Sequence, residues 1–188
     1  MKKQSFSLVE LLMVIAIIAL LMGLLIPAVS SMREKAKVAK AKTEINAIKI
    51  AIKSFETTYG VLPLKDSSNN DMINTTTGLV TEYDKLMEWL TQSDCGYGAS
   101  GVDTSGNPRK VKFLDPLPNG GSYKDPWGNP YVIYLDTDYN DKVTIDGDAL
   151  NGNIFIYSYG KNKNNDNGRC YGINSQNKRL DDIGSWHN

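Results

Sequence analysis

The amino-acid sequence predicts an α+β protein, in which one long N-terminal helix packs on a small antiparallel β-sheet and a loop-rich C-terminus follows. Three observations lead to this prediction. An apolar run fills residues 11–29, an apolar stripe continues at helical spacing to Tyr59, and two β-rich segments lie in the C-terminal half. Outside the apolar run, the 188-residue chain has room for one domain of ordinary size.

The apolar run at residues 11–29 contains no charged residue. As a helix with a rise of about 1.5 Å per residue, it spans roughly 28 Å, close to the thickness of a hydrocarbon core. No small-residue cleavage site follows Val29, so we expect a membrane segment that stays attached to the chain. Lys2 and Lys3 place the N-terminus on the cytoplasmic side.

Residues 5–10, which read SFSLVE, resemble the class III signal of type IV pilins and type II secretion pseudopilins. A prepilin peptidase cuts such signals on the cytoplasmic side, before an aromatic residue that is then N-methylated. The resemblance implies cleavage between Ser5 and Phe6, although Ser5 stands where the family usually has Gly. Pro27 also matches a proline common in this family's apolar helix.

Glu10 lies at the edge of the apolar run, where an ionised carboxylate is costly unless it pairs or reaches the interface. On a generic membrane helix, a side chain that extends to the headgroups is the ordinary explanation. In the pilin interpretation, cleavage creates a cationic amine on Phe6, and the Phe6 amine of a neighbouring subunit is the partner of Glu10. Such a head-to-tail contact propagates as a helical homopolymer of this chain.

The amphipathic part of the helix is predicted to end at Tyr59, with Gly60 as its cap and Pro63 beyond. The stripe fits a covering sheet, whereas a coiled-coil partner is the weaker alternative because the stripe lasts only about two heptads. Its side chains step by three or four residues: Ile45, Ile48, Ile52, Phe55 and Tyr59.

Shorter elements follow. Apolar spacing predicts a second helix over residues 78–91 and a short strand over 111–114. Two further strands, at 131–135 and 153–159, are expected to pair in the antiparallel sheet. The chain therefore divides into a leader (1–5), a transmembrane and assembly helix (6–29), its amphipathic continuation (30–60) and an extracytoplasmic globular α+β region (61–188).

Residues 125–131 read DPWGNPY. Pro126 and Pro130 fix φ and Gly128 permits a tight turn, so the stretch predicts a rigid turn anchored by Trp127. The string also closely resembles the DPWGxPY motif of the G-type major pseudopilin of type II secretion. The resemblance implies a type IV pilin-like fold and points to this subgroup.

The C-terminal segment resembles the calcium loop of the major pseudopilin, which reads SxGxDG and later DDIxxW. Asn162 stands where the family has a carboxylate, and Asp166 would supply the missing charge. The alternative is a charged turn pinned by Trp186. The calcium ligands that the resemblance implies are the Tyr159 carbonyl, Asn162, Asp166, Asp181 and Asp182.

A second and weaker metal candidate comprises Asp136, Asp138 and Asn140, which alternate like the first ligands of an EF-hand loop. Asp141 stands where that loop needs Gly, and Gly147 stands where it needs a bidentate Glu. A solvated hairpin loop is therefore the better explanation of this stretch.

Two cysteines, Cys95 and Cys170, form no CxxC or CxxH spacing. Outside the cytoplasm they are a possible disulfide; two unpaired thiols are the alternative. The lone His187, without a nucleophile–base pair, P-loop or zinc spacing, predicts a protein that is not an enzyme. The formal net charge is zero, so no nucleic-acid partner is expected.

The resemblance implies a major pseudopilin, a structural subunit of the filament of a type II secretion system. It further implies a single pass through the inner membrane, a periplasmic C-terminal region, and as partners the prepilin peptidase, minor pseudopilins and the inner-membrane assembly platform. One alternative is a type IV pilin for adhesion, motility or DNA uptake. An alternative of another class is a membrane-anchored calcium- or ligand-binding domain that does not polymerise.

Overall fold

The computed structural model describes residues 8–64, 72–73, 81–93, 105–115, 123–145, 148–163 and 182–185. The chain forms two compact units, Met1–Lys37 and Val38–Asn188. The described strands and the second helix all belong to the second unit. The α+β class predicted from the sequence is confirmed.

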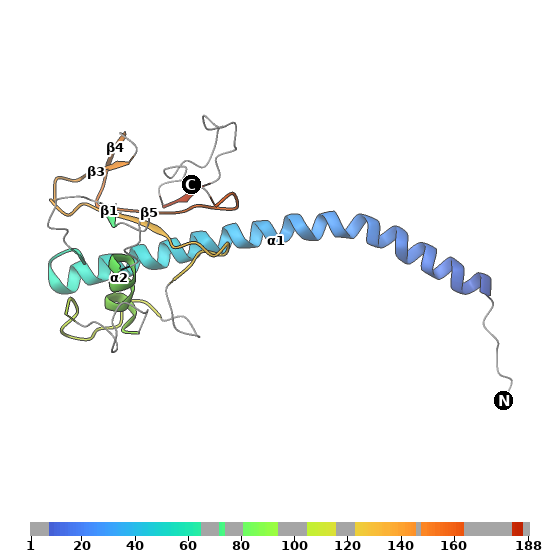
Figure 1. Ribbon diagram of the computed structural model, residues 1–188, viewed down its shortest axis with the longest axis horizontal. Helices are drawn as coiled ribbons and strands as arrows, with labels where there is room; N and C mark the ends of the chain where they lie inside the picture. Colours follow the sequence, from blue (N-terminus) through green and yellow to red (C-terminus); the bar gives the residue numbers. More distant parts are fainter. Residues whose placement is uncertain are drawn as a thin grey trace. The chain divides into compact units, whose positions relative to one another are not determined.

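Helix α1 spans Leu8–Tyr59 (Figure 1). It ends as predicted, because Gly60 adopts a left-handed backbone with φ of 73° and donates its N–H to the Glu56 carbonyl at 2.7 Å. Large apolar side chains near the start of α1, such as Leu8 and Leu12, are exposed. Among the described residues, no helix meets the length and hydropathy expected of a membrane span. The membrane segment at residues 11–29 stays a prediction.

The predicted stripe of α1 enters the core of the second unit. Ile45, Ile48, Ile52 and Phe55 are at most 2% exposed, and Tyr59 is half-buried. Helix α2, at Thr81–Thr91, adds its own buried stripe to the same cluster. Since strand residues such as Ile133 and Ile156 complete this cluster, a sheet covers the stripe, and the coiled-coil alternative is not needed.

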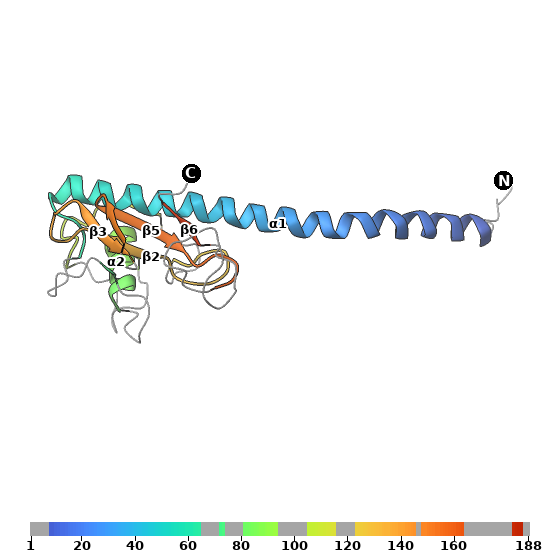
Figure 2. The same cartoon turned by 90° about the horizontal axis from the view of Figure 1, so that it is seen from above.

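The main sheet contains four described strands in the order β1-β2-β5-β6, each antiparallel to its neighbour. In Figure 2, β2, β5 and β6 lie along the C-terminal part of α1. The two predicted central strands are confirmed as β2 and β5, which pair Ile133 with Ile156. The bounds are Met72–Ile73 for β1, Val132–Leu135 for β2, Ile154–Ser158 for β5 and Ile183–Gly184 for β6.

A hairpin covers the other face of the sheet. It consists of β3 (Lys142–Ile145) and β4 (Asp148–Asn151). Val143 and Ile145 pack with the alternate side chains of β2 and β5, such as Tyr134 and Tyr157. Both faces of the two central strands are therefore buried, which explains why every residue of β2 and β5 is buried.

The strand predicted at residues 111–114 is wrong. Phe113 and Leu114 each donate their backbone N–H to the Leu90 carbonyl, both at 2.9 Å. The side-chain oxygen of Asn107 accepts the N–H of Val111 at 3.1 Å. These bonds attach the segment to the end of α2 instead of to a neighbouring strand, and a strand requires such a neighbour.

Gly106 lies flat against the indole ring of Trp89, and a Cβ atom there would be 2.2 Å from three ring carbons. We expect Gly106→Ala to lower the free energy of unfolding by about 1–3 kcal/mol, because the ring or the backbone must move. Chemical denaturation of both proteins measures this difference. The loss should shrink when Trp89→Leu is introduced first; an equal loss in that background would contradict the steric explanation.

Candidate functional site

Glu10 lies in the first turn of α1 and is exposed. A carboxylate at this position interacts favourably with the positive end of the helix dipole. Ser5 and Phe6, the predicted processing site, lie outside the described residues. The contact between Glu10 and the Phe6 amine of another subunit therefore stays a prediction.

The turn around Trp127 is built on the buried side chain of Asp125. Its Oδ1 accepts the backbone N–H of Trp127 at 3.0 Å and that of Asn129 at 2.8 Å. Gly128, with φ of 96°, donates its N–H to the Asp125 carbonyl at 2.9 Å. The stretch thus forms the tight turn that the sequence predicts, and Trp127 packs in the core.

Asp125 also connects this turn to the end of β5. The Ser158 hydroxyl donates to Asp125 Oδ2 at 2.6 Å, and both side chains are buried. The same Ser158 oxygen accepts the N–H of Gly160 at 3.0 Å. The DPWGNPY turn and the start of the predicted calcium loop therefore share one hydrogen-bond network, which the sequence reasoning missed. One local indication of this network is present in the sequence, the aspartate Asp125 directly before Pro126.

A further contact ties the turn to α1. The Tyr131 hydroxyl donates a hydrogen bond to Glu44, which also pairs with Lys40 at 3.7 Å. Burial and the hydrogen bond to Glu44 raise the pKa of Tyr131, so the phenol stays protonated and remains a donor. The sequence placed Glu44 on the polar side of α1 and gave no sign of this partner.

Three of the five predicted calcium ligands are described: Tyr159, Asn162 and Asp182. Strand pairing aligns Ser158 with Ile183, so Tyr159 directly follows one member of this pair and Asp182 directly precedes the other. Asp182 is fully buried, whereas Tyr159 and Asn162 are half-buried. Tertiary pairing thus brings together two candidates that are 23 residues apart in the sequence.

The surroundings of this pair are aromatic. The rings of Tyr157 and Tyr159 meet edge to face, with centroids 6.3 Å apart. Burial raises the pKa of Tyr157, and the neighbouring Tyr134, Tyr159 and Asp182 raise it further. The effect of Asp182 on the pKa of Tyr157 indicates that the two side chains lie close to each other.

The described donors fit calcium in kind. The Tyr159 carbonyl, the Asn162 amide oxygen and the Asp182 carboxylate are all hard oxygen ligands, the type that calcium prefers. Within the described ranges, no cluster of three or more His, Cys, Asp or Glu side chains is arranged to hold a metal ion. Because calcium takes six to eight oxygens, the site also needs Asp166 and Asp181, which lie outside those ranges.

The second metal candidate forms a loop closed by its own hydrogen bonds. Asp136 is buried, and its two oxygens accept the N–H groups of Asn140 at 3.0 Å and Asp141 at 2.8 Å. The Asn140 amide donates to Asp138 at 2.7 Å, and Asp141 has φ of 59°. Burial and the hydrogen bond with Asp138 raise the pKa of Asp136, while the two N–H groups lower it. These contacts close a loop that joins β2 to β3; the two strands lie in different sheets and the first residues of the loop are buried, so the expectation of a solvated hairpin loop is wrong. A metal here stays a prediction.

Cys95 and Cys170 lie outside the described residues, as do Trp186 and His187. The possible disulfide therefore stays a prediction.

Comparison with known proteins agrees with the fold and the motifs. Residues 1–26 match the family model described as the prokaryotic N-terminal methylation motif. The chain is 27% identical over 130 residues to the type II secretion system core protein G of Pseudomonas aeruginosa, covering 69% of this chain and 72% of the relative. It is 29% identical over 150 residues to the protein of the same name from Vibrio cholerae, covering 78% of this chain and 79% of the relative. The chain thus carries the prokaryotic N-terminal methylation motif and, over more than two thirds of its length, is similar to two proteins named type II secretion system core protein G.

Proposed function

We propose that this protein is the major pseudopilin of a type II secretion system, a structural subunit that polymerises into a pilus-like filament. The observation that carries this proposal is the similarity, over 130 and 150 residues, to two proteins named type II secretion system core protein G. The methylation motif at residues 1–26 and the position of Glu10 in the first turn of α1 support it. We assign the protein a structural and not a catalytic role.

The finer features of this function are also proposals. The prepilin peptidase removes residues 1–5, and residues 11–29 anchor the chain in the inner membrane by a single pass. The C-terminal region then lies in the periplasm. Assembly involves minor pseudopilins and the inner-membrane platform, in addition to other copies of this chain.

Processing is the first test of the proposal. In cells that carry the cognate machinery, we expect a mature chain that starts at an N-methylated Phe6 and is recovered in sheared filaments. Intact-mass spectrometry and electron microscopy measure both results. Ser5→Gly, which restores the family's usual residue, is the matched variant and should be processed at least as fast. A filament-free chain that retains residues 1–5 would favour the anchored binding domain.

Calcium is proposed to bind at Asp181 and Asp182 with Tyr159, Asn162 and Asp166, and to hold the C-terminal loop in an assembly-competent shape. The support is the oxygen chemistry of the described donors and the pairing of Ser158 with Ile183, the immediate neighbours of Tyr159 and Asp182. Through the hydrogen bond from Ser158 to Asp125, calcium binding would also stabilise the turn around Trp127.

Calcium removal is expected to lower the melting temperature by several degrees. A ligand at one hundred times its Kd stabilises the folded state by about 2.7 kcal/mol. Calorimetry in calcium, magnesium and a chelator measures the shift. Asp181→Asn should lose the calcium response, while Asp138→Asn, in the other candidate loop, should keep it. Loss of the calcium response in Asp138→Asn but not in Asp181→Asn would assign the site to the loop of Asp138. A wild-type melting temperature that does not change with calcium would refute the proposal.

A further inference from the structure

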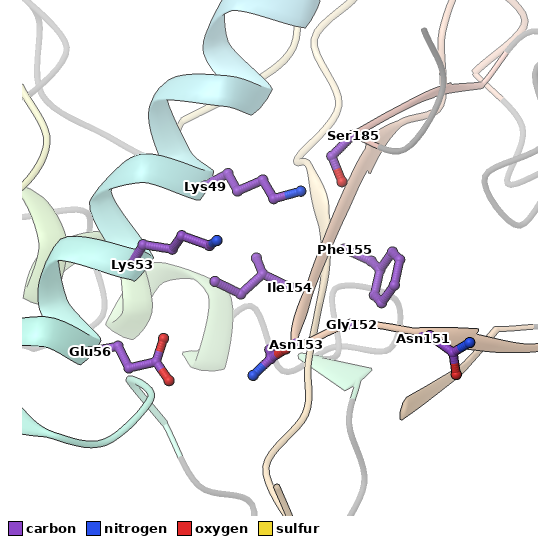
Figure 3. Close-up of a pocket in the computed structure, with 9 residues that line it drawn as sticks. All are labelled: Lys49, Lys53, Glu56, Asn151, Gly152, Asn153, Ile154, Phe155 and Ser185. Atoms are coloured by element: carbon purple, nitrogen blue, oxygen red, sulfur yellow. The ribbon is translucent and has the colours of Figure 1, made fainter. Parts of the chain in front are cut away.

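A cavity of about 350 Å³ lies in the second unit, between α1 and the turn that joins β4 to β5 (Figure 3). Its volume is within the range of roughly 300–1,000 Å³ that small-molecule sites occupy. Lys49, Lys53 and Glu56 line it from α1, and Asn153, Ile154 and Ser185 line the opposite side. Ser185 occupies a variable position of the DDIxxW segment, and the other five residues belong to none of the signal, turn and metal motifs discussed above.

The lining of the cavity carries a net positive charge. Lys49 and Lys53 are four residues apart and share one face of α1. Both ammonium groups point toward the β5 side of the cavity in Figure 3. In the part of the chain that the structure describes, neither lysine forms an ion pair with a carboxylate. Glu56 contributes the one negative charge of the described lining, so a single positive charge is in excess.

The environment of Lys49 disfavours its charged form. Burial lowers the pKa of Lys49, and the charge of Lys53 lowers it further. Both effects penalise the ammonium form, and a nearby anion would oppose them. The arrangement is therefore more favourable with an anion in the cavity than without one.

The opposite wall offers both hydrogen-bond donors and apolar surface. The Ser185 oxygen accepts the N–H of Ile156 at 3.1 Å, which leaves its O–H available to donate. The side chain of Asn153 extends toward the α1 side of the cavity in Figure 3. Ile154 supplies the apolar surface that faces α1, whereas the Phe155 ring lies on the other side of β5 in Figure 3. A Cβ at Gly152 would be 3.2 Å from the Phe155 ring, so glycine permits the close approach of the turn to that ring.

We propose that this cavity binds a carboxylate ligand. The carboxylate oxygens would accept from the Lys49 and Lys53 ammonium groups and from the donors of the opposite wall, and its carbon body would contact Ile154. One carboxylate matches the single excess positive charge, whereas a phosphate dianion would leave one negative charge uncompensated beside Glu56. A free organic acid and an acidic side chain of a second copy offer the same chemistry. The inference does not depend on the proposed function.

Titration of the ¹⁵N-labelled full-length protein in detergent with sodium butyrate tests the proposal, with sodium chloride at equal ionic strength as the reference. We expect saturable shifts of the amide signals of Gly152, Asn153 and Ser185. The double substitution Lys49→Met/Lys53→Met should weaken butyrate binding about tenfold or more, because charge-assisted hydrogen bonds are lost. Circular dichroism verifies that each variant is folded.

Two matched variants separate charge from general effects. Lys49→Arg/Lys53→Arg keeps both charges and should keep butyrate binding. Lys42→Met removes an exposed lysine of the same helix outside the cavity and should change nothing. Absence of saturable shifts in the wild type, or equal affinity in the double methionine variant, would overturn the proposal.

Sedimentation of the same samples distinguishes the two sources of the carboxylate. Self-association that is reversed by butyrate and by the double methionine substitution would identify a second copy as the source. Butyrate binding without any change in association would identify a free organic acid. Either result supports a carboxylate site.

Discussion

Glu10→Ala is expected to abolish filament assembly and to leave the second unit folded, since Glu10 lies in the first turn of α1, within the first unit. A carboxylate at the edge of an apolar segment needs a cationic partner, and the Phe6 amine of a neighbouring subunit is the partner we propose. Breaking a buried ion pair costs about 3–5 kcal/mol, and each 1.4 kcal/mol is tenfold in affinity. Because the contact repeats at every subunit, the lost interaction free energy adds up along the filament. The yield of sheared filaments, measured by immunoblot and electron microscopy, reports it.

Two substitutions at the same position serve as controls. Glu10→Gln preserves the shape of the side chain but not its charge and should fail like alanine. Glu10→Asp preserves the charge on a shorter side chain and should retain part of the assembly. Wild-type filament yield from Glu10→Ala would argue against the head-to-tail contact and in favour of the binding domain that does not polymerise.

Asp125→Ala is expected to lower the free energy of unfolding by about 3–5 kcal/mol. The substitution removes the acceptor of three hydrogen bonds, from the N–H groups of Trp127 and Asn129 and the hydroxyl of Ser158. Each buried donor left without an acceptor costs about 1–3 kcal/mol. Denaturation by guanidinium, followed by tryptophan fluorescence, measures the difference. Since Ser158 lies at the start of the calcium loop that we propose, the expected calcium response should weaken as well.

Asp115→Ala is the matched control, because the Asp115 side chain is 95% exposed and pairs with Lys112 at the surface. Exposed ion pairs contribute at most about 1 kcal/mol, so this variant should unfold nearly like wild type. Asp125→Asn keeps one acceptor oxygen and should be intermediate. If Asp125→Ala were as stable as Asp115→Ala, the turn would be held by packing of Trp127 and not by the carboxylate.

Part of the candidate site followed from motifs alone. Short sequence patterns predict Glu10, Tyr159 and Asp182, and the structure adds that the neighbours of the last two, Ser158 and Ile183, pair across the sheet. The network of Asp125 and Ser158 and the cavity lined by Lys49 and Lys53 were not foreseen. The network joins side chains that are far apart in the sequence, and the cavity depends on which segment packs over one face of α1. Neither feature produces a periodic pattern in the sequence.

The sequence by itself determined the features that depend on near neighbours in the chain. Helical spacing predicted the buried stripe of α1, Gly60 its end, and apolar β-rich runs the strands β2 and β5, because these are governed by local backbone preference and side-chain periodicity. Tertiary structure alone decided how those elements are covered. The segment at 111–114 has strand-like residues but bonds to the end of α2, and the hairpin β3–β4 buries the second face of the sheet. These arrangements depend on which part of the chain, distant in sequence, packs against the segment. A backbone N–H can bond to several acceptors, and an apolar face can be buried by several partners, so local sequence does not select one of them.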